Sequence, residues 1–134
     1  MPLIRSNEYG TVSVNNSVLS KLIVDNMLSM SNLLVPCNRR GKVLRRGFFS
    51  GFNEMLNSVE ISDNSGNFIV KVYFVLLENS KYEQSAKALF DMIEDDFELL
   101  NLDRPIKLIA NVKGIIRNQI LSKKDTEIVR QNDR

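Results

Sequence analysis

The sequence predicts one α+β domain of two layers, in which two helices pack on one face of a mixed or antiparallel sheet. Segments that alternate apolar and polar residues, as strands do, are separated by two long stretches whose apolar residues recur every three or four positions, as in helices. The order of these segments is β-α-β-β-α-β, which is the order of a split βαβ arrangement. The chain has 134 residues, a length that suits a single domain with one core.

The first half of the chain predicts a strand, a helix and a long loop behind a short lead-in at residues 1–8. Residues 9–14 alternate valines with threonine and serine, which indicates a half-buried strand. A helix is expected to begin near Ser17 and to run to about Leu34, and a proline two residues later ends it. Both patterns disappear over residues 36–52, which contain three glycines and five cations but no acidic residue, so we expect a loop there.

The middle of the chain predicts a hairpin. Residues 57–62 alternate as one strand and Asn67–Leu77 form a longer one, with the turn residues Asp63–Gly66 between them. Apolar residues occupy both faces of the longer strand, so we expect it either to be central in the sheet or to have its second face covered.

The last third of the chain predicts a helix, a strand and a tail. Ser80 and Glu83 have the spacing of a capping box, and an apolar stripe continues from there to Leu100. Residues 106–112 alternate as the last strand. Residues 116–134 are mostly polar, so we expect a short tail that frays.

The composition excludes several classes of function. There is no histidine, the commonest general base and metal ligand, and a single cysteine cannot form an internal disulfide. No apolar run approaches the roughly 20 residues that cross a bilayer, and the first ten residues lack the apolar core of a signal peptide. We therefore expect a cytoplasmic protein without metal, cofactor or small-molecule substrate. A net charge of +2 predicts no general attraction to nucleic acid.

Four segments resemble those of a known family. They are Tyr9–Val14 leading into a helix, a strand Phe68–Leu77 followed by Glu78 and Asn79, a helix Tyr82–Leu100, and the stretch Leu108–Ile115. Together they resemble the bacterial alkaline shock protein family, the Gls-type envelope stress-response proteins with small YloU-like members. The resemblance covers residues 9–115, which would form the domain, and it rests on hydrophobic patterns with a few glycines.

The resemblance implies a non-enzymatic bacterial scaffold with a role in cell-envelope homeostasis. Some members of that family self-associate and are held at the inner face of the membrane by a separate protein. The resemblance thus implies a homo-oligomer that docks on a membrane-anchored protein partner. The family pattern carries no active site. The chain departs from the pattern in the basic segment Arg39–Arg46, in the phenylalanines that follow, and at Asn79 or Ser80, where the family has a glycine.

A basic-aromatic loop is the first candidate for partner binding. Its residues are Arg39, Arg40, Lys42, Arg45, Arg46, Phe48, Phe49 and Phe52. Five cations without a counter-charge create a positive field that phosphates, anionic headgroups or an acidic protein surface would neutralise. Two interpretations stay open: a solvated loop whose phenylalanines fill the core, or a docking element for a partner.

An acidic face on the second helix is the other candidate. Its residues are Asp91, Glu94, Asp95, Asp96 and Glu98. Like charges spaced four apart repel each other, and negative charge at the C-terminal end opposes the helix dipole. The face is either simply solvated, or relieved by cations from the basic segment of the same or a neighbouring molecule. In the second case copies join head to tail, which predicts self-association.

Nucleic-acid binding through the basic loop is the alternative function. The long strand offers only Lys71 and Tyr73 to bases and lacks the glycine-aromatic alternation of RNA-binding modules, which weakens that alternative. Cys37 lies beside Arg39 and Arg40, cations that lower the pKa of a thiol. Without a histidine to act as base we expect no catalytic thiol, and the chain is predicted to bind a partner rather than to act as an enzyme.

Overall fold

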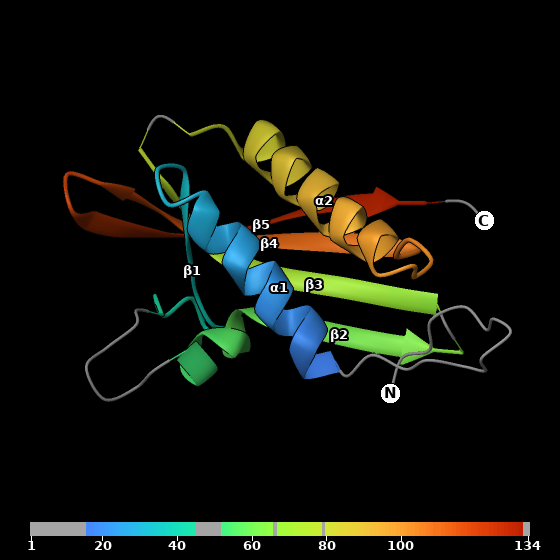
Figure 1. Cartoon of the computed structure of the whole chain (residues 1–134). Coiled ribbons are helices and arrows are strands. Elements are labelled where there is room, and N and C mark those ends of the chain that lie inside the picture. The colour runs from blue at the N-terminus through green and yellow to red at the C-terminus, as the bar shows by residue number, and fades with distance from the viewer. Residues whose placement is uncertain (1–15, 45–51, 66, 79, 133–134) are drawn as a thin grey trace, which may run out of the picture.

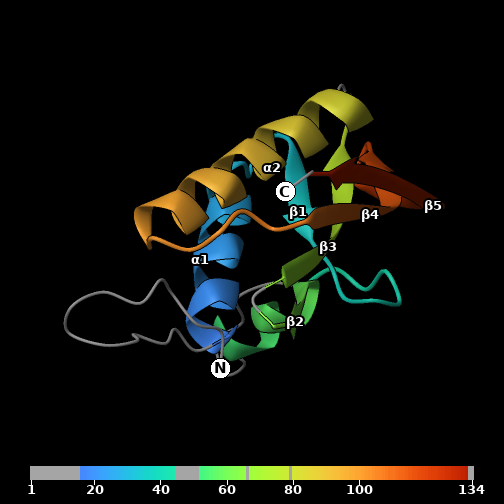
Figure 2. The ribbon, with the colours of Figure 1, turned by 90° about the vertical axis from the view of Figure 1, so that its right-hand side faces the viewer.

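Two helices cover one face of a five-stranded mixed sheet within residues 16–44, 52–65, 67–78 and 80–132, which are the residues that the computed structural model describes (Figure 1). The elements are α1 (Asn16–Ser29), β1 (Leu34–Pro36), a short 3-10 helix η1 (Phe52–Ser58), β2 (Val59–Asn64), β3 (Asn67–Leu77), α2 (Tyr82–Leu99), β4 (Lys107–Arg117) and β5 (Ile120–Gln131). Figure 2 shows both helices on the same side of the sheet. The predicted α+β class is confirmed.

The sheet is arranged around β3. Strands β1 and β2 both pair with one edge of β3, β4 lies parallel along its other edge, and β5 pairs with the far side of β4. All pairs except β3–β4 are antiparallel. The expectation that β3 is a central strand is therefore confirmed. The strand expected at residues 9–14 lies outside the described residues.

The first helix is shorter than the sequence predicted. α1 ends at Ser29 instead of Leu34, because the next residues turn and Leu34 pairs with Leu76 of β3. Ser31 and Asn32 favour such a turn, since their side chains compete with helical hydrogen bonds. Leu34 is buried, as its apolar spacing predicted, but it belongs to the sheet and not to the helix.

The expected loop at residues 36–52 is only partly a loop. After β1 the chain forms a tight turn, in which the Asn38 side-chain oxygen accepts hydrogen bonds from the backbone N–H groups of Arg40 and Lys42. Gly41 has a φ of +87°, which glycine adopts without strain. Cys37 and Val43 form an isolated antiparallel bridge that closes the turn. Residues 45–51 lie outside the described residues.

The second helix agrees with the prediction, but its cap does not. α2 ends at Leu99, one residue before the predicted end, and its N-cap is Lys81, whose side chain makes no capping hydrogen bond. The hydroxyl of Ser80 instead donates to the carbonyl oxygen of Leu33, 2.9 Å away. The predicted capping box was wrong, because Ser80 ties the start of α2 to the segment before β1.

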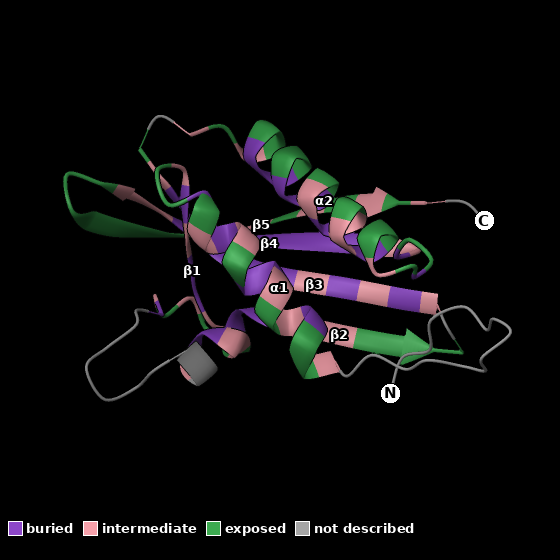
Figure 3. Ribbon diagram, viewed as in Figure 1, coloured by how far each residue is buried: buried purple, intermediate pink, exposed green. Residues whose placement is uncertain are grey.

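The core lies between the helices and the sheet. The inward faces of both helices and of β3 and β4 are buried (Figure 3). Phe68 of β3 and Phe97 of α2 meet edge to face with their ring centroids 5.2 Å apart, a favourable geometry for aromatic rings. In the described part of the chain, no helix combines the length and apolar character that crossing a bilayer requires.

The end of the chain is a strand, not a fraying tail. β4 continues to Arg117 and turns back through Asn118 and Gln119, which both have positive φ as in the two-residue turns of hairpins. β5 then pairs with β4 from Ile120 to Lys123 and from Thr126 to Gln131, with a register shift between the two stretches. The prediction of a tail at residues 116–134 was wrong because an edge strand is largely solvated and therefore polar, which hides the alternation. The hairpin extends beyond the layer of helices (Figure 1).

Candidate binding surface on the strand hairpin

The basic turn packs on the side of the sheet opposite α1 and α2. This outer face carries a small buried cluster of Cys37, Tyr73 and Val75, against which Val43 and Ile116 pack. The turn touches the hairpin directly, because a Cβ on Gly41 would lie 3.4 Å from the Cβ of Lys113. Lys113 is an extra residue of β4 against β3, whereas in the pairing with β5 two residues, Lys124 and Asp125, stand opposite it. The fold thus brings the turn at 38–42 and the β4–β5 hairpin together.

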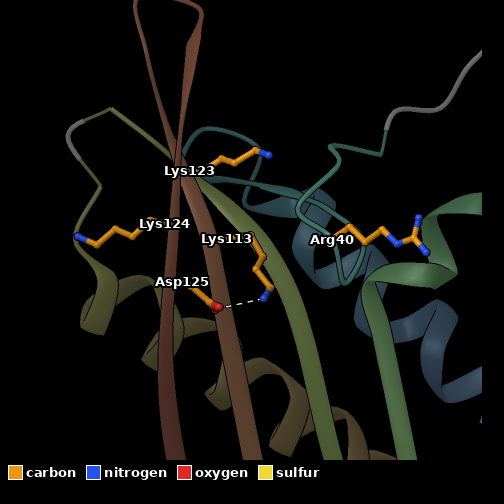
Figure 4. Close-up of a pocket in the computed structure, with 5 residues that line it drawn as sticks. All are labelled: Arg40, Lys113, Lys123, Lys124 and Asp125. Carbon is orange, nitrogen blue, oxygen red and sulfur yellow. Dashed lines mark hydrogen bonds and ion pairs between the residues drawn. The ribbon is translucent and has the colours of Figure 1, made fainter.

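A shallow basic hollow forms where these segments meet. It has a volume of about 370 Å³ and is lined by Arg40, Lys113, Lys123, Lys124 and Asp125 (Figure 4). Four cations face one carboxylate there, so the hollow has a positive potential although the whole chain carries a net charge of only +2. The sequence offered no sign of this cluster, because Arg40 and the three lysines are more than 70 positions apart.

The cations of the basic hollow do not converge on one point. Lys113 Nζ lies 3.1 Å from Asp125 Oδ1, and Lys124 Nζ lies 4.2 Å from the centre of the Tyr82 ring. The head groups of Arg40, Lys123 and Lys124 point away from the Lys113–Asp125 pair (Figure 4). A small-molecule site needs polar groups aimed at a shared volume. The arrangement instead suits an extended anionic surface.

The basic-aromatic loop is only partly available to a partner. Arg39 forms an ion pair with Glu60, and hydrogen bonds with Glu60 and then with Tyr73 raise the pKa of its guanidinium above the usual value. Arg40 and Lys42 are exposed. The remaining residues that the sequence singled out are of two kinds. Arg45, Arg46, Phe48 and Phe49 lie outside the described residues, and Phe52 begins η1 with only its backbone described.

The acidic face of α2 is relieved by the C-terminal strand and not by the basic loop. Arg130 Nη1 of β5 lies 2.9 Å from Asp91 Oδ1 and 2.7 Å from Glu94 Oε1. Its guanidinium also lies 5.3 Å from the centre of the Phe90 ring, a cation–π distance. Of the basic segment, Arg39 pairs with Glu60 and not with these carboxylates, so within the described residues the compensating cation comes from β5.

The rest of the acidic face is more open. Asp96 accepts a hydrogen bond of 2.6 Å from the side-chain amide of Asn26 in α1. Asp95 and Glu98 are exposed. The described residues of the predicted basic site are thus not brought to the acidic face in one molecule.

Cys37 is the opposite of a reactive thiol. It is fully buried, and this burial raises the pKa of the thiol to about 12, while the charge of Lys113 opposes the shift in part. The neighbouring Arg39 and Arg40 do not lower it as the sequence suggested, because they extend into solvent. Within the described ranges, acidic residues and cysteine form no group of three or more able to hold a metal ion.

The functional feature that sequence reasoning missed is the free edge of β5, the side of this strand that faces away from β4. The structure describes no strand on that side. Ile120, Leu121 and Val129 are large apolar residues of β5 with exposed fractions of 67%, 39% and 45%. The two-residue turn at Asn118 and the alternation of Thr126, Ile128 and Arg130 were the available signals, and the polar character of the strand concealed them.

Comparisons with known proteins identify no relative. No model of a known protein family matches the chain, and neither a curated protein nor a solved structure matches it.

Proposed function

We propose that this chain is a non-enzymatic binding protein that holds protein partners, copies of itself included, along the free edge of β5. The observation that carries the proposal is the 12-residue edge strand with three exposed large apolar residues. An edge strand presents unpaired N–H and C=O groups that another strand can use, and natural proteins usually protect such edges. An edge that is both long and apolar in part favours occupation by a partner.

The shape of the hairpin supports the same function. The β4–β5 hairpin projects past the helices, so a partner strand can approach the distal part of β5 without meeting α2 (Figure 1). Exposed apolar residues on a protruding element are typical of interaction sites. A role at the cell envelope, with docking to a membrane-anchored protein, is the setting implied by the resemblance described above. That setting is part of the proposal and draws no support from the comparisons.

Capture experiments with matched variants test the function. The wild-type protein is immobilised and exposed to a native bacterial lysate at low and high salt, beside a variant that combines Leu121→Lys with Val129→Lys. A control variant, Val18→Lys, removes an exposed apolar residue of α1 instead. We expect a protein that binds the wild type and the control but not the double variant. Identical capture by all three would refute edge binding.

Binding of a polyanion is a second candidate, favoured by the basic hollow. Nucleic acid bound there would be held through its phosphates, so its affinity should fall steeply with salt. Fluorescence anisotropy with labelled single-stranded RNA measures this directly. Arg40→Glu should weaken the RNA complex without affecting edge binding, because Arg40 lies outside β5. No binding at low salt excludes this candidate.

A further inference from the structure

We propose that the occupant of the free edge is a second copy of this chain, whose β5 pairs antiparallel with β5 of the first about a twofold axis at Asp125. The inference rests on the proposed function and names its partner. A twofold axis perpendicular to a sheet reverses the direction of a strand and keeps its faces. Residues that face each other across the axis must therefore lie on the same side of the combined sheet.

The pairing with β4 assigns the faces of β5. Leu121 pairs with Ile116, which packs in the cluster of the outer face, and Asp125 bonds Lys113 on that face. Ile128 packs against the main core on the helical side. The outer face of β5 accordingly carries every second residue: Leu121, Lys123, Asp125, Glu127 and Val129.

One register makes this row of residues self-complementary. When Asp125 faces Asp125 of the second copy, Lys123 faces Glu127 and Leu121 faces Val129, and the twofold axis produces each pair twice. Opposite charges and apolar residues facing each other stabilise antiparallel strands. Lys123 and Glu127 have no ion pair within the described part of one molecule, so both are available.

Neighbouring registers are less complementary. A shift of one step toward the turn keeps an opposite-charge pair, Lys123 with Asp125, but sets Lys124 against Lys124. It also sets the apolar Leu121 against Glu127. A shift the other way sets Asp125 against Glu127 on both sides of the axis. Like charges directly opposite destabilise a strand pair. In the favoured register the two Asp125 carboxylates also meet, but each is already held 3.1 Å from the Nζ of its own Lys113.

The pairing also accounts for the protruding hairpin. In an antiparallel dimer the distal part of each β5 lies along the proximal part of the other. Leu121, which one molecule leaves 39% exposed, is covered by Val129 of the second copy, itself 45% exposed. The extension of each hairpin past its own helices is then the length needed to reach across the axis.

Charge reversal tests the register. Sedimentation equilibrium measures the dimer dissociation constant of the wild type, of Lys123→Glu, of Glu127→Lys and of the double variant. Each single change puts like charges opposite on both sides of the axis and should weaken the dimer by about tenfold or more. The double variant exchanges the charges and should return most of the affinity. A double variant as weak as the product of the two single changes would overturn the register.

Cysteine cross-linking tests the axis itself. In a Cys37→Ala background, Asp125→Cys places two thiols on directly opposite residues, whose Cα atoms are roughly 4.5–5.5 Å apart in an antiparallel pair and within disulfide reach. Mild oxidation should give a covalent dimer. The matched control Glu127→Cys puts its two thiols about 14 Å apart, at about 3.4 Å per residue, and should not cross-link.

The outcomes separate this inference from the proposed function. A wild type that stays monomeric at all concentrations, or a dimer that cross-links no better at position 125 than at 127, overturns β5–β5 pairing. Capture of a different protein that is lost in the Leu121→Lys/Val129→Lys variant would keep edge binding in either event. Loss of both capture and self-association would reject the two together.

Discussion

Gly114 lies where the backbones of β4 and β5 approach each other closely. The strands change register there, and a Cβ on this residue would lie 2.7 Å from Leu121 Cδ1 and 2.8 Å from the carbonyl oxygen of Ser122. The side-chain contact can relax by rotation, but the backbone oxygen cannot move without disturbing the strand pair. A glycine is therefore required by close approach of the backbone, not by an unusual φ.

Replacing Gly114 with alanine should destabilise the domain. We expect the free energy of unfolding to fall by about 1–3 kcal/mol, the usual cost of forcing an extra group into a packed site. Urea denaturation measures it. Gly41→Asn is the control, because asparagine tolerates positive φ and the nearest atom to a Cβ there is 3.4 Å away. A Gly114→Ala protein as stable as the control would contradict the close packing.

The thiol of Cys37 should make stability depend on alkaline pH. Its pKa is about 12 in the folded state, against an ordinary value of 9.0. Between these values the unfolded chain releases a proton that the folded chain keeps, so stability falls as the pH rises, by at most about 1.4 kcal/mol per pH unit. Below pH 9 both states keep the proton and the effect vanishes.

Urea denaturation of wild type and Cys37→Ala at several pH values isolates this contribution. The wild type should lose stability faster than the variant above pH 9, and the two should run parallel below it. Parallel curves throughout would show that the thiol is not protected by burial. The sequence could not foresee this protection, because Arg39 and Arg40 suggested a lowered pKa and only the fold shows that the thiol faces inward while they do not.

At the scale of elements, patterns of apolar residues predicted more than patterns of charge did. The long strand β3 and the helix α2 appear with nearly the predicted bounds, since both bury a continuous stripe. The end of α1 was misplaced, because a buried leucine fits a helix and a strand equally well. The compensation of the acidic face could not be predicted, because Arg130 is 36 or more positions away in a segment whose polar character conceals the strand.

The ion pair between Arg130 of β5 and Glu94 of α2 should contribute more to the stability of the domain than the ion pair between Arg39 and Glu60. Arg130 is 23% exposed and Glu94 is 12% exposed, so Arg130→Met removes the cation from a largely buried carboxylate and leaves it the hydrogen bond from the side-chain amide of Asn132. We expect a loss of about 1.5–3 kcal/mol, as for hydrogen bonds to charged groups. Arg39→Met breaks a more exposed pair with Glu60, which solvent screens, and should cost less.

Thermal and urea unfolding of the two methionine variants compare these contacts under one set of conditions. The methionine keeps most of the apolar stem of arginine, so the difference reports the charge and its hydrogen bonds. If Arg130→Met and Arg39→Met were equally stable, the strand would not anchor the helix. Repeating the measurement at high salt should narrow the gap only slightly, since partly buried pairs are weakly screened.

For the whole molecule, the succession α1, β2, β3, α2 and β4 was predictable, whereas β1, β5 and the partnership between distant segments were not. Alternation and helical spacing are local properties, whereas the basic hollow joins the turn at 38–42 to the hairpin more than 70 positions later. Beside the basic hollow, the register of β4 against β3 shifts at the extra residue Lys113. This extra residue has no local signature in the sequence. The free edge of β5 could not be predicted for a related reason, since its exposure follows from the order of strands in the sheet.

Shortening the chain should show that β5 belongs to the fold. A protein that ends at Arg117 loses the strand that covers one edge of β4 and the cation that neutralises α2. We expect no cooperative unfolding, or a midpoint lowered by more than about 10 °C, the shift produced by a loss of several kcal/mol in a domain of this size. A control that ends at Asn132 keeps every described residue. Equal midpoints would restore the interpretation of this segment as a tail.

The central position of β3 has a kinetic consequence. Its 11 residues meet β1 and β2 on one side and β4 on the other, so its amide protons are shielded along nearly the whole strand. Release of these protons to deuterated water requires the parallel and antiparallel halves of the molecule to separate, which amounts to global opening. In the monomer, the β5 amides that point away from β4 can exchange through fluctuations of a single strand. A deuterium map of one protein sample would thus rank the strands from the middle of the sheet outward.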